Sequence, residues 1–103
     1  MEYIILSADS APSVHLVPKD VADNLEKYCK RFWEWMATSP YADKHRVDFD
    51  GYLGLCYDEH DFIEYLNKWV FPDTPSKLIE KFDDFCKVED RPDKYRHCKE
   101  FNF

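Results

Sequence analysis

Residues 18–38 limit the fold more than any other stretch, because their apolar side chains recur with the period of an α-helix. At 100° per residue these side chains fall within an arc of about 160°, and the charged side chains fall outside it. Pro18 suits the first turn of such a helix, and Pro40 stops it. We therefore expect one long amphipathic helix that turns one face to a core. Its apolar positions are Val21, Ala22, Leu25, Tyr28, Cys29, Phe32, Trp33, Trp35 and Met36.

Two short runs before this helix have the composition of β-strands. Residues 3–7 are apolar and rich in β-forming side chains, and residues 13–17 alternate, with Val14 and Leu16 on one side. A cluster of turn-forming residues, DSAPS, separates the two runs. The sequence therefore predicts a first β-hairpin.

Residues 46–57 predict a second hairpin around Asp50-Gly51, a strong signal for a two-residue turn. Such a turn sets Phe49 opposite Tyr52 and Val47 opposite Gly54, with Leu53, Leu55 and Tyr57 on the other face. A three-residue loop would place all the apolar side chains on one face, because a shift of one residue reverses every side chain. We favour the two-residue turn, in which case both faces of the hairpin must meet apolar groups. The C-terminal residues, another chain or the last helix would cover the second face.

Two more helices are predicted in the second half of the chain. Asp58 suits the N-cap of a helix over residues 59–71, which Pro72 ends. Thr74-Pro75 has the pattern of a capped start for a third helix that reaches about Cys86. Its apolar stripe would be Leu78, Ile79, Phe82, Phe85 and Cys86.

The expected order of elements is therefore β-β-α-β-β-α-α. We interpret it as an α+β fold, with a small antiparallel sheet from two β-hairpins and three helices packed mainly on one face. At 103 residues the chain has room for one globular domain, residues 1–103. Residues 88–103 lack periodicity and form a C-terminal tail, which is either loose or pinned by Tyr95, Phe101 and Phe103.

Charge and cysteine usage narrow the function classes. The formal net charge of −7 argues against binding to nucleic acid or to a membrane surface. The first residues lack a basic n-region, and no stretch reaches the length of a membrane-spanning helix. The four cysteines are widely spaced, so we expect reduced thiols in a cytoplasmic protein.

The acidic charge is concentrated in residues 47–67, which contain six acids and no Lys or Arg. This block holds all but one unit of the net negative charge. Together with its tyrosines it predicts a protein-binding module, inhibitor-like or immunity-like, that meets a basic partner surface without catalysis or cofactor. The predicted partner-binding residues are Asp48, Asp50, Tyr52, Tyr57, Asp58, Glu59, Asp61 and Glu64.

Two alternatives stay open. Cys56 and His60, four residues apart at a strand-to-helix junction, could form an activated thiol, or bind zinc together with His97 and Cys98. Neither spacing is a recognised ligand pattern, and the acidic block departs from a calcium loop at its turn position, so we assign no catalytic or metal residue. The other alternative is a structural subunit that forms a homodimer through the second hairpin.

The tryptophans and two of the cysteines have a simpler interpretation. Trp33, Trp35 and Trp69 lie on helical stripes, as do Cys29 and Cys86, so we expect them in the core. Trp35 lies at the edge of its arc, where a side chain is partly exposed.

Overall fold

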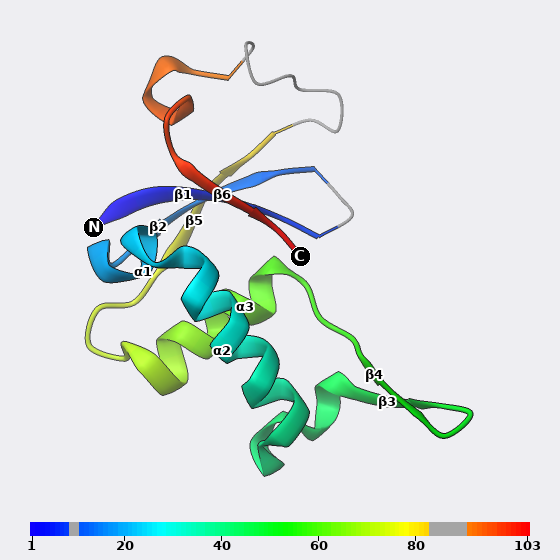
Figure 1. The fold of residues 1–103 in the computed structure, drawn as a ribbon. Helices are drawn as coiled ribbons and strands as arrows, with labels where there is room; N and C mark the ends of the chain where they lie inside the picture. Colours follow the sequence, from blue (N-terminus) through cyan, green and yellow to red (C-terminus); the bar gives the residue numbers. More distant parts are fainter. Residues whose placement is uncertain (9–10, 83–90) are drawn as a thin grey trace.

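The structure, a computed structural model, describes residues 1–8, 11–82 and 91–103. It confirms the α+β class, with helices packed against one face of a four-stranded sheet (Figure 1). The strands are β1 (Glu2–Ser7), β2 (Ser13–Val17), β3 (Arg46–Phe49), β4 (Tyr52–Leu55), β5 (Lys77–Lys81) and β6 (Lys99–Asn102). The helical elements are α1 (Lys19–Asp23), α2 (Leu25–Thr38), η1 (Pro40–His45), α3 (Glu59–Tyr65), η2 (Leu66–Val70) and η4 (Asp93–Tyr95).

The four-stranded sheet has the order β5-β2-β1-β6. The predicted first hairpin is confirmed, since β1 and β2 pair antiparallel with Ile4 opposite His15. Strand β5 pairs antiparallel with the other edge of β2, whereas β6 pairs parallel with β1. The sheet is therefore mixed, which corrects the expectation of a purely antiparallel one. A parallel neighbour for β1 comes from the C-terminal residues, so the described part of the tail, residues 91–103, belongs to the body.

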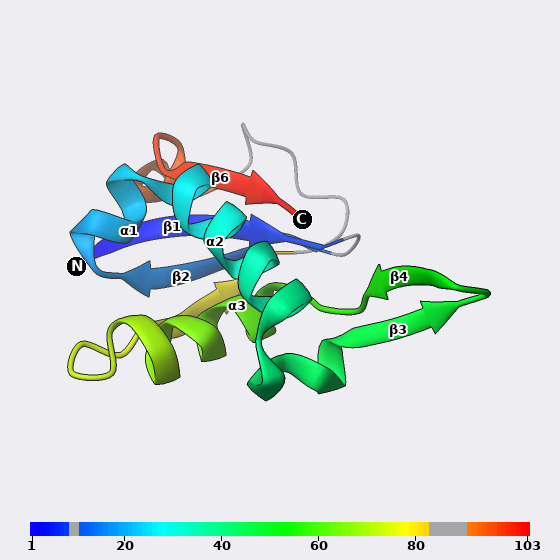
Figure 2. The same cartoon turned by 60° about the horizontal axis from the view of Figure 1, so that its bottom comes forward.

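The main core lies between this sheet and helices α1, α2 and α3, which cover one face (Figure 2). Ile4 and Leu6 of β1 and Val17 of β2 point into it, because alternate residues of a strand share a face. Helix α2 contributes the apolar side chains of its predicted stripe to this core. The fully or nearly buried members from the helices are Val21, Ala22, Leu25, Tyr28, Cys29, Phe32, Met36, Phe62, Ile63, Tyr65 and Leu66.

A smaller apolar cluster covers the opposite face of the sheet. Ile5 and Val14 point to this side and meet Phe82 and Tyr95. The Tyr95 hydroxyl donates a hydrogen bond of 2.9 Å to a Glu80 carboxylate oxygen, which ties the C-terminal segment to β5. Both faces of the central strands are thus buried, although α1, α2 and α3 lie on one side only.

The predicted long helix is present, with one break. Residues 19–38 form α1 and α2, separated at Asn24, whose φ of −130° is not helical. The Asn24 side chain donates to the Asp20 carbonyl oxygen at 3.1 Å and so satisfies one of the carbonyls at the end of α1. The buried positions on both sides of the break are the predicted ones, because the core selects the same face of each helix.

The predicted third helix is wrong where the structure describes it. Residues 77–81 form the edge strand β5, and residues 83–86 lie outside the described part of the chain. Two positions of the predicted stripe, Leu78 and Ile79, are exposed, and Phe82 is buried in the smaller cluster. The unpaired edge of β2 offers hydrogen bonds that a helix over these residues would leave unmade, which favours the strand.

The predicted register of the second hairpin is confirmed, but the hairpin does not join the main sheet. Phe49 lies opposite Tyr52 and Val47 opposite Gly54, as the two-residue turn requires. However, β3 and β4 form a separate two-stranded sheet that projects from the body (Figure 2). The hairpin cannot join the main sheet through β1 or β2, because β6 and β5 already occupy the outer edges of those strands. We call the projecting β3–β4 hairpin, residues 46–55, the arm.

Within the described residues, no helix has both the length and the apolar composition needed to cross a bilayer.

Candidate functional site

The turn at the end of the arm is well defined. Asp50 and Gly51 have φ values of 51° and 90°, and positive φ at both central residues is the conformation that a two-residue hairpin turn needs. The Gly51 backbone N–H donates to the Asp48 carboxylate at 2.9 Å. Two of the predicted partner-binding residues, Asp48 and Asp50, therefore also shape this turn, and both remain exposed.

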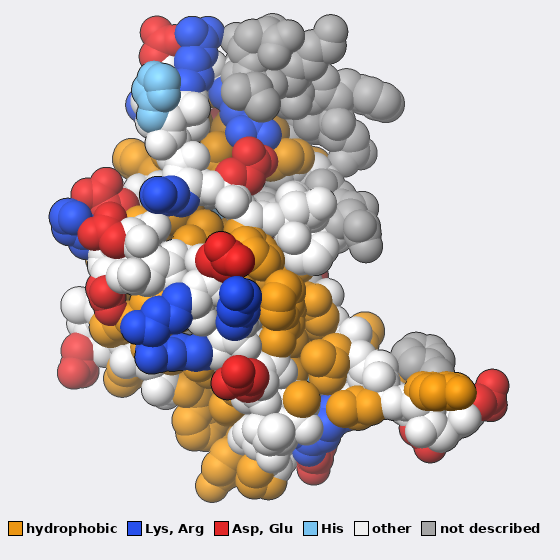
Figure 3. Space-filling view, viewed as in Figure 1, with side chains coloured by type: hydrophobic (Ala, Val, Ile, Leu, Met, Phe, Trp, Pro, Cys, Tyr) orange, Lys and Arg blue, Asp and Glu red, His pale blue; other side chains and the backbone are white. Residues whose placement is uncertain are grey.

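The arm carries exposed apolar side chains beside these acids. Tyr52 is 78% exposed and Leu53 is 61% exposed, on opposite faces of β4. Leu55, nearer the body, packs partly against the main core. Figure 3 shows the arm standing away from the body, with acidic and hydrophobic side chains near its end. The outer part of the arm is therefore exposed on both faces, whereas its base is covered by the body.

The base of the arm is held by backbone contacts. The Cys56 N–H donates to the His45 carbonyl oxygen at 2.7 Å, and the His45 Nδ1–H donates back to the Cys56 carbonyl at 3.1 Å. Arg46 donates through one guanidinium nitrogen to the carbonyl oxygens of Met36 and Ser39, at 2.9 and 2.7 Å. These bonds tie the start of β3 and the end of β4 to the end of α2.

Tyr57, another predicted binding residue, belongs to the edge of the core. Its hydroxyl accepts a hydrogen bond of 2.9 Å from the Trp33 Nε1–H, and its ring lies edge-on to Phe103 with centroids 5.7 Å apart. The C-terminal residues thus cover Tyr57, but Leu53, further along the arm, stays exposed. The proposal that the tail covers the second face of the hairpin holds only at the base of the arm.

The acids at the start of α3 have local structural roles. Asp58 and Asp61 form a capping box, in which each carboxylate accepts from the backbone N–H of the other, at 3.1 and 3.0 Å. Glu59 is buried, with 4% exposure, and one of its oxygens lies 3.9 Å from His60 Nε2. Such placements stabilise a helix start and leave less negative charge for a partner.

Glu64 is neutralised by two lysines from outside the acidic block. Its carboxylate oxygens lie 2.7 Å from Lys68 Nζ and 3.6 Å from Lys44 Nζ. The hydrogen bond from Lys68, followed by the charge of Lys44, lowers the pKa of Glu64 below its ordinary value. The acidic block is therefore divided into two groups at opposite ends of β4, one at the arm turn and one at α3 (Figure 2). Among the described residues, only the group at the arm turn consists entirely of exposed acids without a lysine or arginine partner.

The thiol alternative finds little support in the geometry. Cys56 and His60 are both exposed, yet among the hydrogen bonds of the described residues none joins them. The His60 ring instead lies edge-on to His15, with centroids 6.4 Å apart. Within the same residues no group of three or more His, Cys, Asp or Glu side chains is placed to hold a metal ion.

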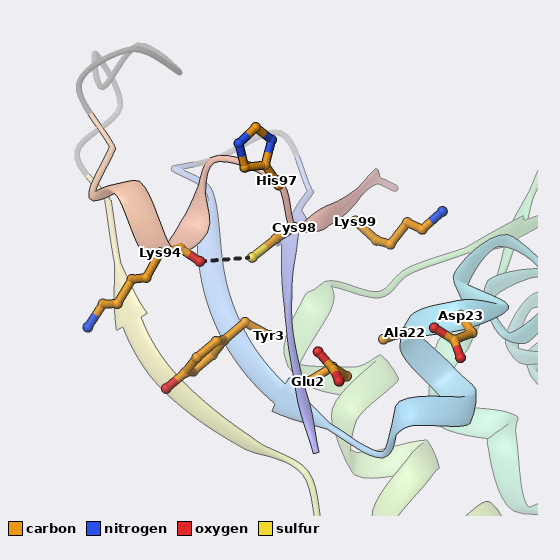
Figure 4. A pocket seen from close by; sticks show the side chains of 8 residues that line it. All are labelled: Glu2, Tyr3, Ala22, Asp23, Lys94, His97, Cys98 and Lys99. Atoms are coloured by element: carbon orange, nitrogen blue, oxygen red, sulfur yellow. Dashed lines mark hydrogen bonds between the residues drawn. The ribbon is translucent and has the colours of Figure 1, made fainter.

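His97 and Cys98 line a separate cavity of about 250 Å³ next to Glu2 and Asp23 (Figure 4). The two side chains point to opposite sides of the chain, and the Cys98 thiol donates to the Lys94 carbonyl oxygen at 3.8 Å. Burial raises the pKa of this thiol, which disfavours the thiolate that a nucleophile requires. This cavity therefore lacks an activated cysteine.

His15 is the most deeply buried titratable side chain of the main sheet. The Ser13 hydroxyl donates to the Leu6 carbonyl oxygen at 3.3 Å, so its single hydrogen is used and it accepts from His15 Nε2 at 2.8 Å. His15 Nδ1 then carries a lone pair without a partner. Burial, with the nearby charges of His60 and Lys81, lowers the pKa of His15 to about 4. Since Ser13 and His15 are fully buried, they are not an accessible catalytic pair.

The structure contains a row of contacting aromatic side chains that the sequence pattern does not predict. Trp35, Trp69 and Tyr41 lie next to one another where α2, η2 and η1 meet. Trp69 was expected in the core but is 47% exposed. The reason is that α3 continues into η2 as a π-helix, whose wider turn places Trp69 outside the stripe expected at 100° per residue. Tyr41 follows Pro40 in a polar connection, and nothing in its neighbourhood signalled a contact with Trp69.

Comparison with protein-family models, with curated proteins and with solved structures gives no match to this chain.

Proposed function

We propose that this chain is a protein-binding module without catalysis of its own, and that it meets a basic surface of its partner through the arm. The observation that carries the proposal is the exposure of Tyr52 and Leu53 on a hairpin that stands away from the core. A large aromatic side chain surrounded by polar groups is a common anchor of protein interfaces. Asp48 and Asp50 supply the polar surroundings and the negative charge.

The backbone of the arm supports the same role. Each of its two strands pairs with the other, and their outer edges carry no further strand in the described part of the chain. An isolated two-stranded ribbon is marginally stable in water, and an unpaired strand edge is a template for another chain. The arm would therefore gain stability from a partner that covers it.

Charge explains why a basic partner fits better than an acidic one. The turn acids Asp48 and Asp50 have no lysine or arginine within ion-pair distance among the described residues, unlike Glu64. Complementary charge accelerates encounter and selects the partner, and salt screens it. Binding through the arm should consequently weaken as ionic strength rises.

The experiment uses a photo-crosslinking amino acid placed at Tyr52, with a matched probe at Glu34 on the exposed side of α2. The chain is exposed to cell extract at low and at high salt, and crosslinked proteins are identified by mass spectrometry. We expect a partner with a basic contact surface that is captured from Tyr52, is not captured from Glu34 and is lost at high salt.

A double variant, Asp48→Asn with Asp50→Asn, separates charge from shape. Asn keeps an oxygen that can accept from the Gly51 N–H and tolerates a positive φ, so the turn should survive. Reduced capture by this variant supports the proposal. Equal capture from both probe positions, or capture that the double variant and salt leave unchanged, would overturn it. Crosslinks between two copies of the chain would instead identify a homodimer through the arm.

A further inference from the structure

The aromatic row at the end of α2 is a surface that the arm does not explain. The Tyr41 and Trp69 ring centroids are 4.9 Å apart with a tilt of 36°, and those of Trp69 and Trp35 are 6.0 Å apart with a tilt of 44°. Tyr41 is 70% exposed and Trp69 47% exposed. In Figure 3, hydrophobic side chains gather at the bottom of the molecule, over the end of α2 and the η1 turn. Exposed aromatic side chains that contact one another form an apolar surface of the kind that marks binding sites.

A cavity of about 130 Å³ lies against this row. Its remaining lining comes from buried His45 and Tyr65 and from four charged side chains, which are Lys44, Asp61, Glu64 and Lys68. A cavity of about 150 Å³ is known to hold a molecule the size of benzene, so this one suits a compact head group and is too small for a folded segment. Aromatic walls combined with a few convergent charged groups are typical of ligand sites.

The π-helix η2 is the second observation that points to a site here. It spans five residues, Leu66–Val70, and follows directly on α3. Such turns are rare and occur frequently at functional sites, because they redirect a side chain at a local cost in hydrogen bonding. In this chain the side chain that gains a new direction is Trp69, a wall of the cavity.

The lining of the cavity already includes two ammonium groups. Lys68 Nζ and Lys44 Nζ lie 2.7 and 3.6 Å from the Glu64 carboxylate. Both lysines are about 60% exposed, and exposed ion pairs contribute little to stability, so Lys44 can move aside at small cost. In the described residues the cation–π contacts use Tyr28, Phe82 and Tyr95, which leaves the rings of the cavity without a cation.

We propose that the cavity lined by Trp35, Tyr41 and Trp69 binds an alkylated ammonium group, in which methyl groups cover the positive nitrogen. Aromatic faces are negative and attract a cation that sits on them. A methylated ammonium group needs no hydrogen-bond acceptor for each N–H, and it loses less hydration on entering an aromatic cavity than a plain lysine ammonium does. Once Lys44 has moved aside, the Glu64 carboxylate supplies the balancing charge. This site does not depend on the arm.

A substitution of Lys44 distinguishes a cationic ligand from an anionic one. A cationic ligand competes with Lys44 for Glu64, so removing the Lys44 charge should tighten binding. An anionic aromatic ligand, such as a nucleotide, would stack on the same rings and use Lys44 and Lys68 as partners, so the same change should weaken its binding. The two ligand classes thus predict opposite signs for one substitution.

The test titrates the full chain with choline and, separately, with dimethylbutanol, its uncharged carbon analogue. Tryptophan fluorescence and the NMR signals of the indole N–H groups report binding. We expect choline to bind in the millimolar range and to shift the Trp69 signal, and dimethylbutanol to bind about tenfold more weakly, as loss of a cation–π contact of moderate strength implies. A trimethyllysine peptide and its unmethylated form show whether the group is presented by a protein.

Three variants complete the experiment. Trp69→Leu should weaken choline binding about tenfold, and Lys44→Met should strengthen it. Tyr52→Leu, which alters an exposed aromatic residue on the arm, should leave choline binding unchanged, so failure here and failure of the arm proposal are distinguishable. If Trp69→Leu loses its native near-ultraviolet spectrum, Tyr41→Leu takes its place. Equal binding of choline and dimethylbutanol, weaker binding by Lys44→Met, or no binding of choline would overturn the proposal.

Discussion

The side-chain amide of Asn67 holds both backbone polar groups of Ser76. The Ser76 N–H donates to Asn67 Oδ1 at 2.7 Å, and Asn67 Nδ2–H donates to the Ser76 carbonyl oxygen at 3.0 Å. This pair of bonds mimics one step of a β-ladder between η2 and the start of β5. It fixes Ser76 in an extended direction and so delivers the following residues to the edge of β2.

Replacing Asn67 by Ala should therefore destabilise the protein by about 1–3 kcal/mol, since two backbone groups at a buried residue lose their partners. Unfolding in urea measures the change. Asn24→Ala is the matched control, because the Asn24 amide binds an exposed carbonyl and should matter less. Equal losses for the two variants would show that the Ser76 contacts are not what positions β5.

Phe103→Ala should cost about 2 kcal/mol of unfolding free energy, which a thermal melt detects. The Phe103 ring packs against Phe62 and Tyr57, with centroid distances of 5.5 and 5.7 Å, and its N–H donates to the Ser7 carbonyl. The exposed Tyr52 provides the control, because Tyr52→Ala removes an aromatic ring that is 78% exposed. An unchanged melting temperature for Phe103→Ala would mean that the C-terminal residues do not contribute to the core.

Stability should fall as the pH drops from about 6.5 to about 4, because of His15. Its pKa is lowered to about 4 in the folded chain, mainly by burial, from an ordinary value of 6.5. Between these two pH values the unfolded chain binds a proton at His15 and the folded chain does not. The stability that neutral His15 contributes is therefore complete above pH 6.5 and is lost as the pH falls toward 4. The loss is on the order of 3 kcal/mol at pH 4.

His15→Leu isolates this contribution, since Leu cannot take up a proton and the Ser13 hydroxyl keeps its bond to the Leu6 carbonyl. We expect the variant to lose less stability than the parent chain between pH 7 and pH 4.5, as measured by denaturant unfolding at each pH. Parallel pH profiles for the two chains would contradict the assignment to His15. An NMR titration of the His15 ring gives its pKa directly.

The cysteines should differ strongly in reactivity. Cys56 is exposed, whereas Cys29 is fully buried and its pKa is raised to about 12, chiefly by burial and also by Glu26. Because the thiolate is the reactive form, brief treatment with iodoacetamide should label Cys56 and leave Cys29 intact until the chain unfolds. Peptide mapping by mass spectrometry gives the ratio of the two labels, and comparable early labelling would contradict this placement.

What the sequence predicted correctly was local. Asp50-Gly51 determines a turn of two residues with positive φ, and that turn sets the register of the whole arm. The apolar arc of residues 18–38 identified the buried side of α1 and α2, since a helix repeats its face without reference to the rest of the chain. The capping residue Asp58 likewise marked the start of α3.

What the sequence could not show depended on distant partners. Residues 77–81 fit a helix as well as a strand, and the free edge of β2, more than sixty residues earlier in the chain, decides between them. The same is true of β6, which has no period of its own and pairs with β1. In the candidate sites, composition alone leads to the prediction of Tyr52 and the turn acids, which stays a prediction. The contact between Tyr41 and Trp69 depends on a π-turn that no local pattern indicates.

The pairing of β1 with β6 also bears on how the chain folds. The Ser7 hydroxyl and the Asn102 side chain are hydrogen-bonded across 95 positions of sequence, whereas only residues 8–12 separate β1 from β2 in the sequence. Closing so long a loop costs entropy that only the completed pairing recovers. We expect β6 to dock late in refolding and to detach first during native-state hydrogen exchange, so that its amides exchange before those of β1 and β2. Protection of β6 equal to that of β1 would instead indicate that the sheet forms and opens as one cooperative unit.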